Sequence, residues 1–164
     1  MSSERLQRAS EQLGRLLEQR SLRVITAESC TGGWISKVLT DIAGSSAWVE
    51  GGFVSYSNRC KEHMLGVAPA LIASHGAVSE PVVRAMAEGA LAHSDADLSV
   101  AVTGVAGPDG GTRDKPVGLV WFGWAGKGYA THTASSRFSG DRDAVRLATV
   151  LYAIRGLRDL IEND

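Results

Sequence analysis

Apolar residues at helical spacing mark both ends of the chain. Near the start they recur every three or four positions up to about Arg20, on one face of a predicted helix: Leu6, Ala9, Leu13, Leu16 and Leu17. A last helix is predicted to begin at Asp141, and its apolar face carries Val145, Ala148, Leu151, Ile154, Leu157 and Leu160. Both patterns are typical of helices that turn one face toward a core.

Between these helices, short runs of apolar and β-branched residues predict the strands of a sheet. The runs cover residues 22–27, 48–56, 98–103, 117–124 and 129–138. Residues 98–103 are apolar enough for a central strand. Gly126-Lys127-Gly128 predicts a hairpin between the last two strands, and the pair Gly51-Gly52 predicts a bulge or a close backbone approach inside the second.

Helical segments alternate with the first of these strands. We expect a helix over Gly32–Leu39 with Trp34 on its buried side, a short helical turn over Lys61–Leu65, and a further helix opened by Ser79-Glu80-Pro81. Such alternation predicts a largely parallel sheet covered on both faces. The expected architecture is one α/β domain over residues 1–164, a three-layer α/β/α sandwich whose mixed, mostly parallel sheet includes a late antiparallel hairpin strand.

Composition and charge argue against several classes of function. With 17 basic and 18 acidic residues the net charge is −1, so no basic field favours nucleic acid or an anionic membrane. Cys30 and Cys60 make no disulfide framework, and no apolar stretch resembles a signal-peptide core or a membrane span. The four histidines are scattered without metal-ligand spacing. We therefore expect a cytoplasmic protein with no nucleic-acid or membrane partner and no metal site.

The turn Thr26-Ala27-Glu28-Ser29-Cys30-Thr31-Gly32-Gly33 follows the first strand and leads into a helix. Open α/β sheets bind ligands at this place, where the free N–H groups of the helix favour negative charge. Ser29 and Cys30 are potential nucleophiles, and Gly32-Gly33 lets the backbone approach a ligand closely. The alternative is an ordinary helix start, with Ser29 or Thr31 as its N-cap.

Three further segments carry candidate chemistry. The glycine-rich loop Thr103–Thr112 can form a backbone nest for an anion, but it is neither a Walker A loop nor a dinucleotide fingerprint, so a plain connection stays open. Lys61 is either a solvated cation or a neutral amine in an apolar cleft that takes a proton from a serine. Arg142 or Arg146 either belongs to the charged first turn of the last helix or clamps a phosphate.

Taken together, the segments resemble those of one family. In chain order they are Thr26-Ala27-Glu28-Ser29-Cys30-Thr31-Gly32-Gly33, Gly51-Gly52-Phe53-Val54-Ser55-Tyr56, Gly76-Ala77-Val78-Ser79-Glu80, Thr103-Gly104-Val105-Ala106-Gly107-Pro108, Lys115-Pro116-Val117-Gly118 and Gly140-Asp141-Arg142. Over nearly its whole length the chain resembles the CinA C-terminal domain, also called the PncC nicotinamide-nucleotide amidohydrolase family. It looks like the stand-alone form, without the N-terminal domain of the longer members.

The resemblance implies a three-layer α/β/α fold and hydrolysis of the carboxamide of nicotinamide mononucleotide, a pyridine nucleotide, to nicotinate mononucleotide and ammonia, with no metal or cofactor. The serine–lysine pair of the family and its assisting tyrosine correspond to Ser29, Lys61 and Tyr56, and Arg142 is assigned to the phosphate. The residues then expected at the substrate are Cys30, Thr31, Gly32, Gly33, Thr103, Gly104, Gly107 and Arg142.

Two tryptophans depart from the pattern of the family. Trp34 and Trp121 stand where a smaller aliphatic residue and a tyrosine are expected. With Trp48 and Trp124 they fall on apolar faces and are expected in the core, although a bulky side chain beside the turn can also change the choice of substrate.

The mechanism expected from these residues is acyl transfer to serine. Neutral Lys61 takes the proton of Ser29, and backbone N–H groups around Cys30–Gly33 stabilise the oxyanion. Protonated Lys61 or Tyr56 then donates a proton to the departing ammonia, while Thr103–Gly107 and Arg142 hold the ribose phosphate.

Alternatives remain open at this point. Cys30 is the rival nucleophile at a helix N-terminus. A non-catalytic nucleotide-binding or interaction module of the competence or damage-inducible type is the second reading, and a phosphohydrolase that uses the glycine-rich loop is the third. The amphipathic first helix either covers the sheet or forms the contact of a homodimer.

Overall fold

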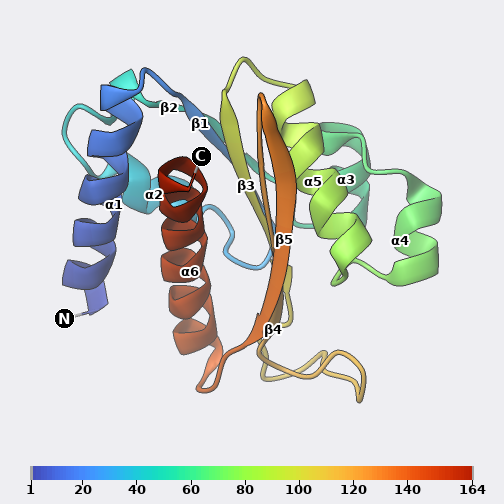
Figure 1. The fold of residues 1–164 in the computed structure, drawn as a ribbon. Helices are drawn as coiled ribbons and strands as arrows, with labels where there is room; N and C mark the ends of the chain where they lie inside the picture. The colour runs from blue at the N-terminus through green and yellow to red at the C-terminus, as the bar shows by residue number, and fades with distance from the viewer. Residues whose placement is uncertain (1, 164) are drawn as a thin grey trace.

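The computed structural model describes residues 2–163, so Met1 and Asp164 of the expected domain lie outside the described part. Within this range a five-stranded sheet lies between two layers of helices (Figure 1). Listed in the order in which they lie side by side, the strands are β2 (Val49–Val54), β1 (Val24–Glu28), β3 (Leu98–Gly104), β4 (Leu119–Gly126) and β5 (Tyr129–Arg137).

The directions of the strands confirm the predicted mixed sheet. β1 pairs in parallel with both β2 and β3. β4 is antiparallel to β3 on one side and to β5 on the other. Of the strands in residues 2–163, β4 alone therefore runs against the rest, as expected for a late hairpin added to a parallel sheet.

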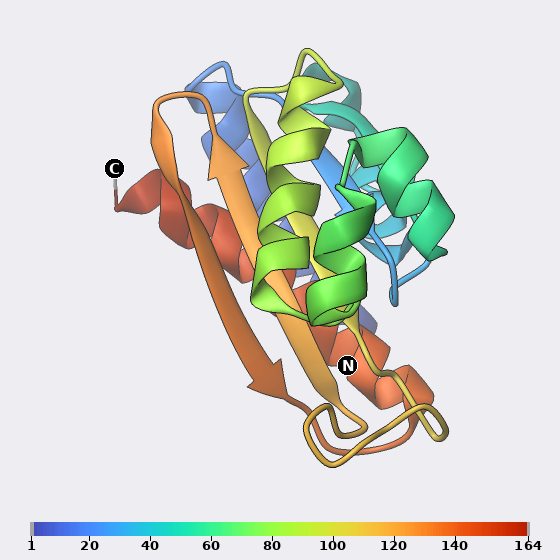
Figure 2. The same ribbon diagram turned by 90° about the vertical axis from the view of Figure 1, so that its right-hand side faces the viewer.

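Helices cover both faces of the sheet. One layer consists of α1 (Ser2–Gln19), α2 (Trp34–Thr40) and α6 (Arg142–Glu162). The other, which faces the viewer in Figure 2, consists of α3 (Asn58–Leu65), α4 (Pro69–His75) and α5 (Glu80–Ala92). A short 3₁₀ helix at Ser45–Ala47 precedes β2. Each layer packs on the sheet through its own hydrophobic core.

The two terminal helices pack on each other. α1 contacts α6, and α6 in turn packs on β3 and β4, so α6 has protein on two sides. Its buried set is therefore wider than the predicted stripe: Ile161 is buried, whereas Ala148 and Leu160 are only half-buried. Of the predicted apolar face of α1, Leu6, Ala9, Leu13 and Leu17 belong to or pack against the core on the α6 side, whereas Leu16 is half-buried outside it.

Local signals in the sequence are confirmed at two places. Asp141 caps α6, because its side chain accepts a hydrogen bond from the amide of Ala144 at 2.9 Å. The pairing of β1 with β2 shifts register just before Gly51. A Cβ on Gly52 would collide with the hydroxyl oxygens of Thr26 and Ser36, so this glycine provides the close approach that was expected.

Several expectations were wrong in detail. β2 ends at Val54, so Tyr56 lies in the loop beyond the strand. α3 begins before Lys61, because Ser57 Oγ accepts from the amide of Cys60 at 3.0 Å and starts the helix earlier. Ser79 stands at the N-cap of α5, but its hydroxyl donates to the carbonyl of Gly76 instead of capping the helix.

One helix was not predicted, and two tryptophans are less buried than expected. α4 is short and mostly exposed, so it has no strong apolar stripe in the sequence. Trp48 and Trp124 are buried in the core, whereas Trp34 and Trp121 are half-buried at its margin.

The carboxyl ends of β1 and β3 and the N-terminus of α6 come together at one end of the sheet, the lower end in Figure 1. The loops there carry most of the predicted site residues. Among the helices of residues 2–163, none combines the length and the apolar character that a membrane crossing requires.

Candidate active site

Ser29 and Lys61 meet at the carboxyl end of β1. Ser29 directly follows that strand and is held by its own amide, which donates to the carbonyl of Val102 on β3 at 3.1 Å. Lys61 comes from α3, on the opposite side of the turn, and its Nζ lies 2.9 Å from Ser29 Oγ. Two residues 32 positions apart in the sequence are thus brought within hydrogen-bonding distance by the fold.

The Lys61 amine is enclosed. The side chain is 1 % exposed, and this burial lowers the pKa of the amine from its ordinary value of 10.5, because the charged form loses its hydration. Nζ also donates to the carbonyls of Ser55 at 3.1 Å and Tyr56 at 2.8 Å. No carboxylate pairs with Nζ within the described residues, so no ion pair with an acidic side chain opposes the lowering of the Lys61 pKa.

The two carbonyls also orient the amine. When the amine is neutral, its two N–H groups satisfy Ser55 and Tyr56, and its lone pair can take the single hydroxyl proton of Ser29, which otherwise goes to the carbonyl of Tyr56. After it accepts that proton, the ammonium has three N–H donors for the same three oxygen atoms. The same geometry therefore suits both a general base and a general acid.

Tyr56 contacts the Ser29–Lys61 pair through its backbone carbonyl. Its carbonyl accepts from Lys61 Nζ and, at 3.3 Å, from the hydroxyl of Ser29. Its side chain is 59 % exposed and has no hydrogen bond to Ser29 or Lys61. The phenol is therefore free to face a ligand from the solvent side.

Glu28, which the sequence analysis did not single out, caps α2. The residue at the N-cap position itself is Gly33, with φ 105° and no side chain, so neither Ser29 nor Thr31 is the cap. The carboxylate of Glu28 accepts instead from the amides of Ile35 at 2.8 Å and Ser36 at 2.9 Å. The sequence signal that could have identified Glu28 is that it is the single charged residue of its strand, at the end of an uncharged apolar run.

Arg146 holds the same turn from α6. Its Nε donates to the carbonyl of Cys30 and its Nη2 to the carbonyl of Thr31, both at 3.0 Å. The guanidinium also lies 5.6 Å from the centre of the Trp34 ring, in cation–π geometry. Trp34 thus supports Arg146 beside the turn, and its ring is half-buried there.

These contacts leave part of the turn backbone open. The amide of Gly32 donates to the carbonyl of Ser29 at 3.1 Å. The amide of Cys30 interacts with its own thiol, whereas those of Thr31 and Gly33 have no acceptor within residues 2–163. Gly32 is exposed and Gly33 half-exposed, so a ligand can reach the backbone at these two residues, whereas Cys30 and Thr31 are buried. The turn therefore offers N–H donors next to Ser29, as an oxyanion requires.

The Cys30 thiol is poorly suited to act as the nucleophile. Its side chain is buried, and this burial raises the pKa of the thiol to about 12, with nearby Glu28 adding to the rise. A thiol with this pKa is almost entirely protonated at neutral pH. The structure thus favours Ser29 over Cys30 at this turn.

Three of the predicted substrate residues, in or just before the glycine-rich loop, contact neighbouring segments. Thr103 is buried and donates to the carbonyl of Ala77 at 3.0 Å, so its hydroxyl is already engaged. Gly104 lies against Leu119 and Val120 and has no room for a side chain. The carbonyl of Gly107 accepts from Arg142 Nη1 at 2.7 Å, which joins the loop to the start of α6.

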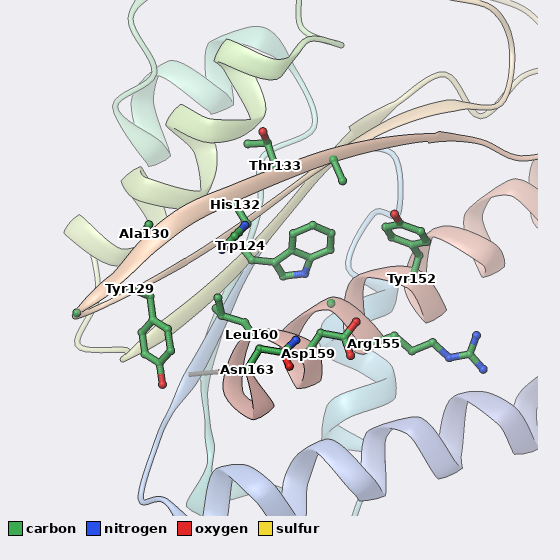
Figure 3. A pocket seen from close by; sticks show the side chains of 13 residues that line it. Trp124, Tyr129, Ala130, His132, Thr133, Tyr152, Arg155, Asp159, Leu160 and Asn163 are labelled. Atoms are coloured by element: carbon green, nitrogen blue, oxygen red, sulfur yellow. The ribbon is translucent and has the colours of Figure 1, made fainter.

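A separate groove lies away from these residues. It has a volume of about 720 Å³ and is bounded by β5 and the second half of α6, with Trp124, His132 and Tyr152 among its walls (Figure 3). Neither Ser29 nor Lys61 lines it. Within residues 2–163, no three His, Cys, Asp or Glu side chains are grouped so that they could hold a metal ion.

Comparisons with known proteins agree with the sequence pattern. A family model described as the CinA C-terminal domain matches residues 6–161. The chain is 55% identical over 157 residues to the nicotinamide-nucleotide amidohydrolase PncC of Escherichia coli (strain K12), covering 96% of this chain and 95% of that one. It is 51% identical over 164 residues to PncC of Enterobacter agglomerans, covering 99% and 100% of the two chains. The crystal structure of the competence/damage inducible protein CihA from Agrobacterium tumefaciens superposes with a TM-score of 0.93 at 43% identity over 95% of each chain.

Proposed function

The chain belongs to the CinA C-terminal domain family, and we propose that it hydrolyses the carboxamide of nicotinamide mononucleotide by a serine–lysine mechanism. The products are nicotinate mononucleotide and ammonia. The observation that carries the proposal is the buried contact of 2.9 Å between Lys61 Nζ and Ser29 Oγ. The names of the relatives, which are more than half identical to this chain, support the substrate class.

The first half of the reaction forms an acyl-enzyme. Ser29 Oγ attacks the carboxamide carbon while its proton moves to the neutral amine of Lys61. The free amides of the turn hold the oxygen that becomes negative. When the intermediate collapses, the carbon–nitrogen bond breaks and the proton on Lys61 passes to the leaving nitrogen, which departs as ammonia.

The second half reverses the roles with water. A water molecule attacks the ester carbon and gives a proton to Lys61, which returns it to Ser29 Oγ as the acid is released. Because Lys61 is oriented by two carbonyls throughout, it needs no change of position between the steps. The positive pyridinium ring of the substrate draws electrons from the amide and lowers the barrier to attack.

Two apolar side chains beside the turn are suited to the ring of the substrate. Val54 and Tyr56 are unusually exposed for large hydrophobic residues, at 48 % and 59 %. Val54 borders Gly33, since a Cβ on that glycine would lie 3.5 Å from Val54 Cγ2. We assign these two side chains to the flat face of the pyridinium ring.

Arg142 is the better candidate for the phosphate. Its side chain is exposed and uses one N–H group, toward Gly107. Arg146 is half-buried, donates to two carbonyls and rests on Trp34. A free guanidinium edge beside a glycine-rich loop is the arrangement that binds a phosphate. We therefore assign the phosphate to Arg142 and the support of the turn to Arg146.

The test is the release of ammonia and nicotinate mononucleotide from nicotinamide mononucleotide, with and without a chelator. We expect turnover that the chelator does not change and that is lost in Ser29→Ala. Ser135→Ala, on the exposed side of β5, is the matched control and should keep full activity. Binding without turnover would support the non-catalytic module instead, and chelator-sensitive turnover would overturn the metal-free mechanism.

The cytoplasmic location and the homodimer remain predictions. α1 is already packed on α6, so the alternative in which that helix forms a subunit contact gains no support from its burial. Sedimentation of the purified protein measures its oligomeric state directly.

A further inference from the structure

Glu28 lies at the centre of a buried hydrogen-bond cluster. It is the last residue of β1, and none of its side chain is exposed. Oε1 accepts from the hydroxyl of Thr31 at 2.6 Å and the amide of Ile35 at 2.8 Å. Oε2 accepts from the amide of Ser36 at 2.9 Å and the hydroxyl of Thr26 at 3.2 Å. Each oxygen of this carboxylate is thus bound twice.

The backbone of Glu28 reaches the other half of the active site. Its carbonyl accepts from the amide of Ser55 at 2.8 Å. The carbonyl of Ser55 in turn accepts from Lys61 Nζ at 3.1 Å. One residue therefore connects the helix that follows Ser29 with the strand end that orients the amine.

The carboxylate satisfies two amides of α2 and none of the turn. The first amides of a helix have no partners within the helix and must be satisfied by other groups. Glu28 takes those of Ile35 and Ser36, which lie inside α2 and away from Ser29 in the chain. Arg146 takes the carbonyls of Cys30 and Thr31. Neither residue takes the amides of Thr31 and Gly33, which stay open within residues 2–163.

We propose that Glu28 is a positioning residue, which anchors α2 and the turn so that the open amides of the turn stay in place for the oxyanion. This inference rests on the proposed function. It explains why a buried carboxylate precedes the nucleophile although it does not touch the reacting atoms. The negative charge near Cys30 also disfavours a thiolate there, which leaves the serine as the nucleophile.

The substitution Glu28→Gln tests this role. The glutamine amide keeps one accepting oxygen, but its NH₂ group cannot accept, so it opposes a donor from the turn or from α2. Removing one oxyanion donor typically costs about 100- to 1000-fold in rate, and a displaced turn disturbs several donors. We expect kcat to fall by at least about 100-fold, while KM for nicotinamide mononucleotide stays within about threefold, because oxyanion donors act on the transition state more than on the bound substrate.

The matched control is Glu80→Gln, which changes a carboxylate that binds Arg84 and Thr133 instead of the turn. Its kcat and KM should equal those of wild type. If Glu28→Gln does not fold, Thr31→Val removes a single bond to the carboxylate at constant side-chain volume. That variant should lose about tenfold in kcat with KM unchanged, since an alignment error affects the transition state more than binding.

All rates are taken per folded molecule, with the folded fraction from circular dichroism. A purely structural role would lower the folded fraction and leave kcat per folded molecule at the wild-type value, which would overturn the inference. So would a parallel change in kcat and KM. If wild type itself releases no ammonia, the proposed function fails and this inference with it; if wild type is active and Glu28→Gln equals it, this inference alone fails.

Discussion

Replacing Lys61 by methionine removes the amine and keeps most of the volume of the side chain. A positioned general base typically contributes about 100- to 10,000-fold to the rate. We therefore expect kcat/KM for ammonia release from nicotinamide mononucleotide to fall within this range in Lys61→Met. The loss corresponds to about 2.7–5.5 kcal/mol of transition-state stabilisation.

The effect on stability is smaller and can be worked from the contacts. Lys61→Met removes the donors of two carbonyls, those of Ser55 and Tyr56. The hydroxyl of Ser29 still reaches Tyr56 at 3.3 Å, so only the carbonyl of Ser55 is left unpaired. An unpaired buried group costs about 1–3 kcal/mol, and removal of the buried amine acts in the opposite direction.

These magnitudes separate loss of chemistry from loss of folding. A protein at the lower limit of ordinary stability, about 5 kcal/mol, that loses 3 kcal/mol is still only about 3% unfolded. Unfolding therefore cannot produce a hundredfold loss of activity. Urea unfolding and the ammonia assay, made on the same preparations, measure the two quantities.

The dependence on pH gives a second test with a definite sign. Burial lowers the pKa of Lys61 below 10.5, so between the lowered pKa and 10.5 the unfolded state binds more protons than the native state. Stability therefore rises with pH across this interval in wild type relative to Lys61→Met, and the cost of burying the charge is fully present below it. The activity of wild type should rise over the same region, as the amine loses its proton.

Lys37→Met is the matched control, since Lys37 is an exposed lysine of α2 paired with Asp41 at 2.7 Å. Its activity should remain within about twofold of wild type, because an exposed pair contributes little. A folded Lys61→Met protein that retains more than about a tenth of the wild-type kcat/KM would refute the assignment of the base. Wild-type stability that falls with pH in the stated interval would refute the buried neutral amine.

Three further predictions test other parts of the structure. Ser29→Ala should lose at least about 1000-fold in ammonia release and Cys30→Ala less than about tenfold, and the reverse order would move the nucleophile to the thiol. Arg142→Gln should raise KM for nicotinamide mononucleotide about 10- to 100-fold but not KM for the nucleoside that lacks the phosphate, because one charge-assisted hydrogen bond contributes about 1.5–3 kcal/mol; an equal KM effect on both would place the phosphate elsewhere. Ser10→Ala should raise the free energy of unfolding in urea by about 1 kcal/mol, because Ser10 Oγ is buried in α1 and has no partner within residues 2–163; a less stable variant would contradict that environment.

The order of elements and the fold class could be predicted because they follow from local periodicity. Alternating strands and helices indicated the sandwich, and the glycines near 126–128 indicated the hairpin. The errors lie where tertiary contacts outweigh the local pattern. The buried face of α6 is wider than predicted because α1 lies on its outer side. The helix α3 begins before the predicted start because Ser57 caps it.

The site residues also divide into those that the sequence indicated and those whose role depends on tertiary contacts. The resemblance of motifs pointed to Ser29 and Lys61, but no spacing rule connects residues from two different elements. The role of the Tyr56 carbonyl, the capping by Glu28 and the support by Arg146 all depend on backbone groups, which carry no sequence signature.

The sequence by itself determined which chain segments form strands and helices, and which side chains can carry a nucleophile, a base and a phosphate contact. These are properties of single residues and of their neighbours along the chain. Only the tertiary structure decided that Lys61 is buried against Ser29, which lowers the pKa of its amine, and that Cys30 is buried as a protonated thiol. The physical reason is that desolvation and hydrogen-bond geometry depend on what surrounds a group in space, and those surroundings come from elements far apart in the chain.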